Sequence, residues 1–269
     1  MRDVRIGTSG WAYKDWNGPF YPEEVKAAGR LEHISRRFRT LEINASFYRM
    51  PTDNAVAGWR EQTPDDFLFA WKASRFITHN KKLKDPAEPL AYMLQRADGL
   101  GPKLGPILFQ LPPNLHRNDE RLQTFLDALP AGYRYSVEFR HPGWYADEVL
   151  EMLRHRNVAL CVSDHHHAPA PWEATADFVY LRGHGPGGDY HGRYGEAALK
   201  DWAKAIQGWR KDRDVVVYFD NDIKSAAPAD ADQLIGLLDE ASQATPAVGP
   251  GFQFADARTF GRACLRVGL

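Results

Sequence analysis

Short apolar runs recur along the chain, and they are separated by segments whose apolar residues are spaced as on one face of a helix. Eight segments of consecutive or alternating apolar residues have the length and the flanking turn residues of β-strands. We expect these strands at residues 4–10, 40–48, 67–72, 106–111, 134–140, 158–163, 178–182 and 215–219. Between them, apolar residues three or four positions apart predict amphipathic helices, as in the stripe of Leu199, Trp202, Ala203 and Ile206.

The alternation of strands and helices, with no linker or break in composition, predicts one α/β domain over residues 1–269 with a parallel sheet. Eight such units in 269 residues match the closed (β/α)8 TIM barrel. An open doubly wound sheet is the alternative, but no Gly-x-Gly-x-x-Gly turn follows the first strand to support it. Asp53, and either Asn118 or Asp119, are predicted to be helix N-caps.

Composition and charge narrow the expected partners. The net charge of -1 provides no overall attraction for nucleic acid or for a membrane surface, so any basic site has to be local. The two cysteines, Cys161 and Cys264, build no disulfide framework, and the first residues enter a strand pattern without a signal peptide. No apolar run approaches the roughly 20 residues that span a bilayer. We therefore expect a soluble cytoplasmic protein that does not bind membranes.

Polar side chains gather at the carboxyl ends of the predicted strands. In residues 40–48, apolar Leu41 and Ile43 alternate with polar Glu42 and Asn44, which is the period of a strand. Alternate residues of a barrel strand point into the lumen, and active sites lie at the C-terminal face. The polar residues that occupy alternate positions at the carboxyl end of each strand therefore form a candidate site. The set is Thr8, Glu42, Asn44, Lys72, Gln110, Glu138, Arg140, Asp164, Arg182, His184 and Asn221.

Acids, cations and amides in this set predict acid/base chemistry on a bound substrate. The candidate catalytic groups are Glu42, Glu138, Asp164 and His184. The other seven are predicted to bind the substrate. One alternative is a polar plug, in which the three acids only neutralise Lys72, Arg140 and Arg182, because buried charges pair. Another is a divalent cation held by the carboxylates, which the nearby cations disfavour, so no metal ligand is assigned.

Loops on the same face add candidate binding groups. Trp11 and Tyr48 belong to aromatic segments that either stack on a base or sugar or pack on one another, and His141 follows the fifth strand. The Gly-rich residues 183–188 beside Arg182 are predicted to bind an anion. We interpret the three histidines at 165–167 as solvated, because successive side chains point in different directions. Aromatic residues after position 246 are expected to hold the tail to the body.

Several of these segments occur together in one known family. They are Thr8-Ser9-Gly10-Trp11, Glu42-Ile43-Asn44, Gln110-Leu111-Pro112-Pro113, Glu138-Phe139-Arg140-His141-Pro142 and Arg182 with His184. Over nearly the whole chain the sequence resembles the YecE-like family, known as domain of unknown function 72. The resemblance implies a barrel like that of the endonuclease IV and xylose isomerase group, without an established activity. Residues 165–167, and residues 222–225 without a Gly-containing turn, depart from the family pattern.

Two classes of function fit these observations. The first is an enzyme that acts on a phosphorylated or otherwise anionic small molecule by hydrolase- or isomerase-like acid/base chemistry, with no cofactor assigned. The second is a noncatalytic barrel that binds nucleic acid or a nucleotide. A polynucleotide that spans several phosphates would give steep salt dependence, and a single phosphate would give shallow dependence.

Overall fold

The computed structural model describes residues 1–243. Eight parallel strands form a closed barrel in sequence order, in which each strand pairs with the next and β8 pairs with β1. The strands are β1 (Val4–Ser9), β2 (Thr40–Ile43), β3 (Leu68–Lys72), β4 (Leu104–Gln110), β5 (Tyr135–Glu138), β6 (Ala159–Ser163), β7 (Phe178–Gly183) and β8 (Asp214–Phe219). The predicted (β/α)8 TIM barrel is confirmed.

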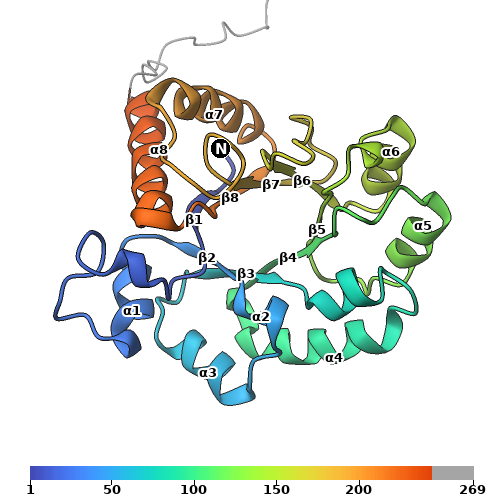
Figure 1. Cartoon of the computed structure of the whole chain (residues 1–269), viewed down its shortest axis with the longest axis horizontal. Helices are drawn as coiled ribbons and strands as arrows, with labels where there is room; N and C mark the ends of the chain where they lie inside the picture. Colours follow the sequence, from blue (N-terminus) through green and yellow to red (C-terminus); the bar gives the residue numbers. More distant parts are fainter. Residues whose placement is uncertain (244–269) are drawn as a thin grey trace, which may run out of the picture.

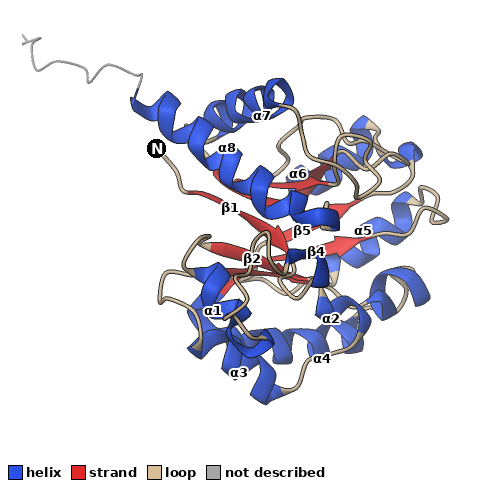
Figure 2. Ribbon diagram, turned by 60° about the vertical axis from the view of Figure 1, so that its left-hand side comes forward, coloured by secondary structure: helices blue, strands red, loops and turns tan. Residues whose placement is uncertain are grey.

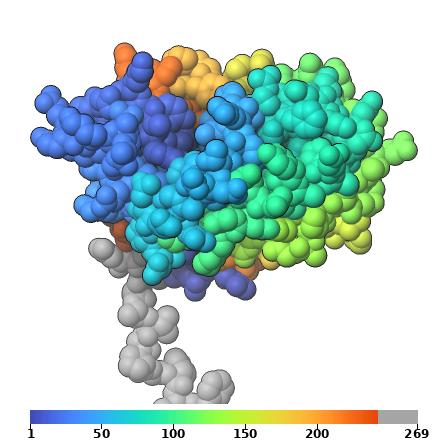
Figure 3. Space-filling model, turned by 90° about the horizontal axis from the view of Figure 1, so that it is seen from below, coloured from blue at the N-terminus to red at the C-terminus, as the bar shows by residue number. Residues whose placement is uncertain are grey.

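Helices surround the ring of strands, because parallel neighbours need long crossover connections (Figures 1 and 2). They are α1 (Arg30–Ser35), α2 (Ala45–Tyr48), α3 (Asp53–Glu61), α4 (Ala87–Ala97), α5 (Asp119–Asp127), α6 (Asp147–His155), α7 (Glu196–Trp209) and α8 (Ala226–Gln243). Segments from the first half of the chain form one continuous face of the molecule (Figure 3).

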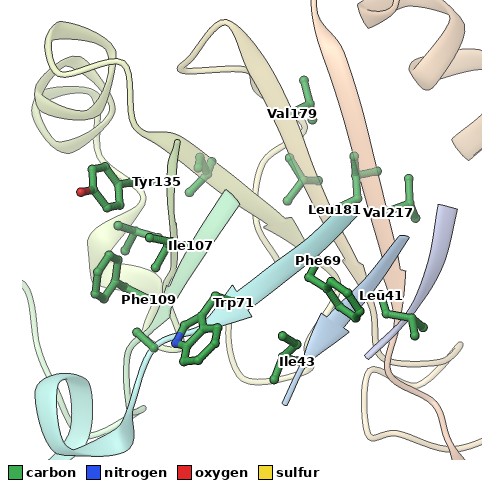
Figure 4. Packing of buried hydrophobic residues seen from close by; sticks show 14 of the residues in the cluster. Leu41, Ile43, Phe69, Trp71, Ile107, Phe109, Tyr135, Val179, Leu181 and Val217 are labelled. Atoms are coloured by element: carbon green, nitrogen blue, oxygen red, sulfur yellow. The ribbon is translucent and has the colours of Figure 1, made fainter. Parts of the chain in front are cut away.

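The barrel has one hydrophobic core outside the strands and another in its lumen. Leu41, Ile43 and Trp71 belong to the outer core, between strands and helices (Figure 4). The lumen is filled by a smaller cluster that includes Tyr180 and Tyr218. Because both faces of each strand are buried, the strands read as continuous apolar runs in the sequence, which is typical of parallel sheets.

The second strand is shorter than the sequence predicts. It ends at Ile43, and the next residues form the short helix α2 instead of continuing the alternation to Tyr48. The Ser46 hydroxyl donates to the carbonyl oxygens of Ile43 at 2.8 Å and Lys72 at 2.6 Å, which fixes this turn against the end of β3. Glu42 keeps its inward position, whereas Asn44 lies on the rim of the barrel.

Side chains at the helix starts confirm one predicted cap and correct another. The Asn118 side chain accepts a hydrogen bond from the backbone N–H of Arg121 at the start of α5, as expected. Thr52, rather than Asp53, caps α3 by accepting from the N–H of Ala55. Both side chains satisfy donors that a first helical turn leaves free.

The described residues 1–243 contain no helix with the length and apolarity needed to cross a membrane. The tail after position 246, whose packing was predicted from its aromatic residues, lies outside the described part of the chain.

Candidate functional site

Arg182 lies at the centre of a charge network inside the barrel, near the carboxyl ends of the strands. Its side chain is fully buried, and its Nη2 atom lies 2.8 Å from both Glu42 Oε1 and Asp220 Oδ2. Its Nη1 atom lies 2.9 Å from Glu138 Oε2. One guanidinium, which carries five N–H donors, therefore joins three carboxylates from β2, β5 and the end of β8.

Glu42 is held by two hydroxyl groups as well as by Arg182. Ser9 Oγ donates to its Oε1 at 2.5 Å, and Tyr180 Oη donates to its Oε2 at 2.6 Å. Burial on its own would raise the pKa of Glu42, but the positive charges of Arg182 and then Lys72 lower it. Glu42 is therefore an ionised acceptor with both oxygens in use.

Glu138 has a similar environment on the neighbouring wall. Its Oε1 lies 2.6 Å from Arg140 Nε and accepts a hydrogen bond from Ser163 Oγ at 3.0 Å. Burial opposes ionisation, yet the guanidinium groups of Arg140 and Arg182 hold the pKa of Glu138 well below its usual range. Both glutamates therefore stay charged at neutral pH.

His184 joins this network as a neutral ring. Its Nε2 atom lies 3.0 Å from Arg140 Nη2 and 3.2 Å from Arg182 Nη1, so it accepts from these donors. Burial lowers the pKa of His184 well below its ordinary value. Its backbone N–H donates to Asp164 Oδ1 at 2.7 Å, and Asp164 Oδ2 accepts from the hydroxyl of Tyr194. Asp164 thus ties the loop after β6 to the loop after β7.

A pocket of about 550 Å³ lies beside the network, where the loops after the strands meet. Its volume is in the range of small-molecule sites. The polar side chains around it belong to Tyr13, Asn44, Lys72, His79, Gln110, Tyr190, Asp220 and Asp222. Its aromatic walls include Trp11, Phe47 and Tyr48. The pocket therefore combines hydrogen-bonding groups with rings on which a flat or apolar part of a ligand can pack.

Lys72 is the cation of the pocket. Its side chain, 5% exposed, extends from the end of β3, and Nζ lies 4.7 Å from the centre of the Phe47 ring. Within residues 1–243 its ammonium group forms no hydrogen bond and has no carboxylate oxygen within 4.0 Å. Burial, and next the charge of Arg182, lower the pKa of Lys72 to about 8.

Two aspartates after β8 contribute acids with raised pKa values. Burial raises the pKa of Asp220, although Arg182 lies 2.8 Å from it. Burial, and next the charge of Asp220, raise the pKa of Asp222 to about 9, so Asp222 is protonated at neutral pH. Asp222 Oδ1 and Asn44 Oδ1 are both buried without a hydrogen-bond partner among the described residues. The pocket therefore has an acid and an amide available for a ligand.

Comparison with known proteins places the chain in a family. A family model described as "Protein of unknown function DUF72" matches residues 5–252. The chain belongs to the DUF72 family. The UPF0759 protein YecE of Escherichia coli (strain K12) is 32% identical over 157 residues, which make up 58% of this chain and 55% of YecE. The match thus spans about half the length of YecE. The UPF0759 protein YunF of Bacillus subtilis (strain 168) is 25% identical, with 88% of this chain and 95% of YunF covered.

Solved structures agree with this assignment. A DUF72 family protein from Thermotoga maritima has a TM-score of 0.81 and 28% identity, with 88% of this chain and 100% of that chain covered. A DUF72 family protein from Enterococcus faecalis has a TM-score of 0.76, 18% identity and coverage of 88% and 95%. D-Psicose 3-epimerase from Clostridium cellulolyticum, at 14% identity and a TM-score of 0.52 over 89% and 97% of the chains, shares the barrel fold.

Five of the predicted binding residues of this DUF72 chain line the pocket. They are Trp11, Asn44, Tyr48, Lys72 and Gln110. The predicted Glu42, Glu138, Arg140, Arg182 and His184 instead form the network, where each is at most 4% exposed. For these charges the structure has the arrangement of the polar plug, in which arginines and carboxylates neutralise one another. Lys72, which the plug interpretation also included, is not paired in this way.

At three strand ends, the side chain that enters the lumen belongs to the chain neighbour of the predicted residue. Ser9 rather than Thr8 reaches Glu42, and the Thr8 hydroxyl donates to the carbonyl oxygen of Gly10 at 2.8 Å. Ser163 enters the network in place of Asp164.

The third difference follows β8, where Asp220 reaches Arg182. Asn221 instead donates to Asp230 Oδ2 at 2.8 Å and to the carbonyl oxygen of Gly192 at 2.7 Å. Its amide holds the loop after β7 against α8. His141 also has a local role, because its Nδ1 accepts from the N–H of Gly143 in the loop after β5.

The Gly-rich loop after β7 does not bring Arg182 to an exposed anion site. Arg182 is fully buried between its carboxylates. The N–H of Gly185 donates to Tyr194 Oη at 2.8 Å, and the N–H of Gly188 donates to the Gly185 carbonyl at 2.8 Å. The structure therefore does not bring Arg182 together with free backbone amides of residues 183–188, as the sequence predicted.

The histidines at 165–167 are not equally solvated. His166 and His167 are exposed, as expected, but His165 is buried with its ring 5.2 Å from that of His184. Burial lowers the pKa of His165 to about 3, so this ring is neutral. Within residues 1–243, no three His, Cys, Asp or Glu side chains are grouped so that they could hold a metal ion.

Sequence reasoning missed Asp220, Asp222, Tyr180 and Tyr190. Tyr180 could have been found, because it has the same strand parity as Arg182 two residues later. Tyr190 lies in a loop and its hydroxyl accepts from Arg140 Nη1 at 3.0 Å, a contact between residues 50 positions apart that no local pattern indicates.

Proposed function

We propose that this DUF72 protein is an enzyme that acts on a small anionic molecule in the pocket, with Lys72 as the cation that meets the anion. The observation that carries this proposal is the isolation of Lys72. Arg140 and Arg182 are each held by buried carboxylates, whereas the ammonium of Lys72 faces the pocket with no carboxylate of the described chain within ion-pair distance. Asp220, Glu42 and Glu138 act on its charge only from farther away. A buried cation without a partner is unfavourable, so a bound anion would stabilise it.

Other pocket residues support acid/base chemistry on the bound molecule. The amides of Asn44 and Gln110 can orient it, since both line the pocket and the Asn44 oxygen has no partner among the described residues. Asp222, protonated at neutral pH, can donate a proton. Glu42 and Glu138, which the sequence indicated as acid and base, instead support the site by keeping Arg182 fixed. A proton donor beside an anion site suits an isomerase- or hydrolase-like reaction.

A noncatalytic nucleotide-binding barrel is the second candidate, and the aromatic rim favours it. The Tyr48 side chain lines the pocket and is 69% exposed, so a base could stack on its ring while a phosphate contacts Lys72. Neither candidate requires a long basic surface, in keeping with the net charge of -1.

Titration with inorganic phosphate and with a nucleoside monophosphate tests the anion site. We expect Lys72→Met to weaken phosphate binding by about 1.5–3 kcal/mol, which is more than tenfold in affinity. The matched control is Lys200→Met, which removes an exposed lysine paired with Glu196 on α7 and should bind like the wild type. Equal binding by wild type and Lys72→Met, or binding by neither, would contradict the proposal.

Tyr48→Ala separates the two candidate functions. If a base stacks on this ring, the variant should lose about 1–3 kcal/mol of nucleotide binding and no phosphate binding. If the substrate is a small anion, both ligands should bind Tyr48→Ala about as well as the wild type. Isothermal titration at two salt concentrations provides both comparisons, and a single phosphate contact gives a shallow salt dependence.

A further inference from the structure

We infer that Lys72 is also a nucleophile, whose amine forms a Schiff base with an aldehyde or ketone group of the substrate. The inference rests on the proposed function for the place of the substrate in the pocket, and it adds a substrate class and a covalent step. Lys72 leaves the end of β3 with one side of its terminal group against the Phe47 ring and the other toward the pocket. A carbonyl carbon in the pocket therefore has access to Nζ.

A second buried lysine shows what a structural lysine looks like in this barrel. Lys103, also 5% exposed, donates to the carbonyl oxygens of Arg60 at 2.6 Å and Thr63 at 2.7 Å, and lies 3.3 Å from Thr63 Oγ1. Three acceptors thus fix the position of its ammonium. Lys72 has equal burial and no hydrogen-bond acceptor within residues 1–243, so no hydrogen bond of the fold holds its N–H groups.

The surroundings of Lys72 favour the neutral amine that attacks carbonyl groups. Burial, and next the charge of Arg182, lower its pKa from an ordinary 10.5 to about 8. At pH 7 this corresponds to roughly 300-fold more neutral amine than an exposed lysine provides. Desolvation beside another cation is a recognised way to activate a lysine for imine formation.

Asp222 can move the protons that the step requires. The Nζ lone pair forms the C–N bond while the carbonyl π pair moves to oxygen, which takes the proton of Asp222. Asp222 then recovers a proton from nitrogen and delivers it to the departing hydroxyl, so water leaves and a protonated C=N bond remains. One proton is consumed overall, and hydrolysis of the imine returns it.

The charge of the product fits the same pocket. A protonated imine carries one positive charge, as the ammonium of Lys72 does, so an anionic group of the substrate stays neutralised after the bond forms. The pocket of about 550 Å³ suits a small molecule. We therefore assign as substrate class a small aldehyde or ketone with a phosphate or carboxylate group.

Reductive trapping tests this step without knowledge of the natural substrate. The wild-type chain is incubated with pyruvate, glycolaldehyde phosphate or acetone, together with cyanoborohydride, whose hydride converts an imine to a stable secondary amine. Peptide mass spectrometry should locate the adduct on Lys72, at a rate roughly 300-fold above that of an exposed lysine such as Lys200 at pH 7, in proportion to the neutral amine. The rate should rise with pH and level off above about 8. No adduct on Lys72 with any probe, or labelling no faster than at Lys200, would overturn the inference.

Lys72→Arg separates this inference from the proposed function. The guanidinium keeps a positive charge but forms no imine, so phosphate binding should persist while the adduct disappears. A wild type that binds phosphate and forms no adduct would overturn the inference and leave the anion site standing. Efficient trapping of acetone without phosphate binding would overturn the anion site and leave the Schiff-base inference standing. Asp222→Asn should slow trapping by about 100-fold or more if Asp222 moves the protons; an unchanged rate would remove it from the step.

Discussion

The barrel holds two neighbouring groups of charged residues that are arranged in opposite ways. In the network, Arg182 contacts three carboxylates, and Glu138 contacts two guanidinium groups. In the pocket, Lys72 has no such partner among the described residues, and the Asp222 carboxyl has a buried oxygen without one. Burial alone therefore does not indicate function, because both groups are buried. What distinguishes the pocket is a buried cation, Lys72, without a carboxylate within ion-pair distance, whereas Arg182 contacts three carboxylates even though its Nε atom has no hydrogen-bond partner among the described residues.

This difference also explains the pKa values of the two groups. At Glu42 and Glu138 of the network, opposite charges outweigh burial and lower the pKa, although burial still raises that of Asp220. In the pocket, burial dominates, so the pKa of Lys72 falls and that of Asp222 rises, each toward the neutral form. Neutral acids and bases near physiological pH can exchange protons with a substrate, whereas tightly paired ions cannot.

Arg182→Met should have the largest effect, because it breaks the centre of the network. The variant leaves Glu42, Glu138 and Asp220 without their shared partner inside the barrel. We expect the free energy of unfolding, measured by urea denaturation, to fall by about 3–5 kcal/mol.

The control applies the same substitution to an exposed ion pair. Arg36 pairs with Glu32 on α1, with side chains 74% and 56% exposed, so Arg36→Met should change the free energy of unfolding by less than about 1 kcal/mol. If Arg182→Met loses no more than this control, the network does not stabilise the barrel and its contrast with the pocket disappears.

The pH dependence of stability should expose the cost of isolating Lys72. The unfolded chain binds the lysine proton up to its ordinary pKa of 10.5, whereas the folded chain releases it near 8. The fold is therefore destabilised while Lys72 is protonated, and stability returns as the pH rises from about 8 to 10.5. In total this difference amounts to roughly 3 kcal/mol.

Lys72→Met isolates this contribution from other titrating groups. At pH 7 the variant should be at least as stable as the wild type. As the pH approaches 10, the free energy of unfolding of the wild type should rise relative to that of the variant by up to roughly 3 kcal/mol. Urea midpoints of both proteins, measured from pH 7 to 10, give the comparison. A variant that is less stable than the wild type at pH 7 would mean that Lys72 is held by the fold, as the residues of the network are.

The barrel fold could be predicted from the sequence, but which residues of each strand face the lumen could not be predicted for every strand. Eight apolar runs alternating with helical stripes predict the (β/α)8 fold because each run buries both of its faces. For the same reason, the run that forms β8 gives no sign of which residues face the lumen. The strand pattern therefore predicts Asn221 at the site, although Asp220 points inward and Asn221 holds α8.

The isolation of Lys72 could not be read from the sequence. Lys72, Arg140 and Arg182 all follow strands and were assigned together as cations that face an anion. Which of them remains unpaired depends on distances between side chains from different strands, such as the 2.6 Å between Arg140 and Glu138. Tyr48 lines the pocket, and it reaches the rim from a helix and not from the predicted strand.

Tyr180→Phe removes a single hydrogen bond from the network and tests whether its partners can compensate. Tyr180 Oη donates to Glu42 Oε2 at 2.6 Å in the lumen, and within residues 1–243 no other hydrogen bond to that oxygen is formed. The variant should lose about 1.5–3 kcal/mol of unfolding free energy, because a buried charged acceptor loses its donor. The matched Tyr92→Phe, on the exposed face of α4, should be neutral. Equal urea midpoints for the two variants would mean that the network adjusts.

Gln110→Leu should have the smallest effect on stability, and it tests the pocket side of the comparison. Gln110 ends β4, and among residues 1–243 its amide makes only a 3.5 Å contact with the carbonyl oxygen of Leu111. We expect the free energy of unfolding to change by no more than about 0.5 kcal/mol. Phosphate binding should weaken by about 0.5–1.5 kcal/mol if the amide donates to the ligand. Gln123→Leu, which removes an exposed contact with Asp127 on α5, should leave binding unchanged. A loss of stability without a loss of binding would place Gln110 with the network, and the unpaired groups of the pocket would no longer be distinguished by function.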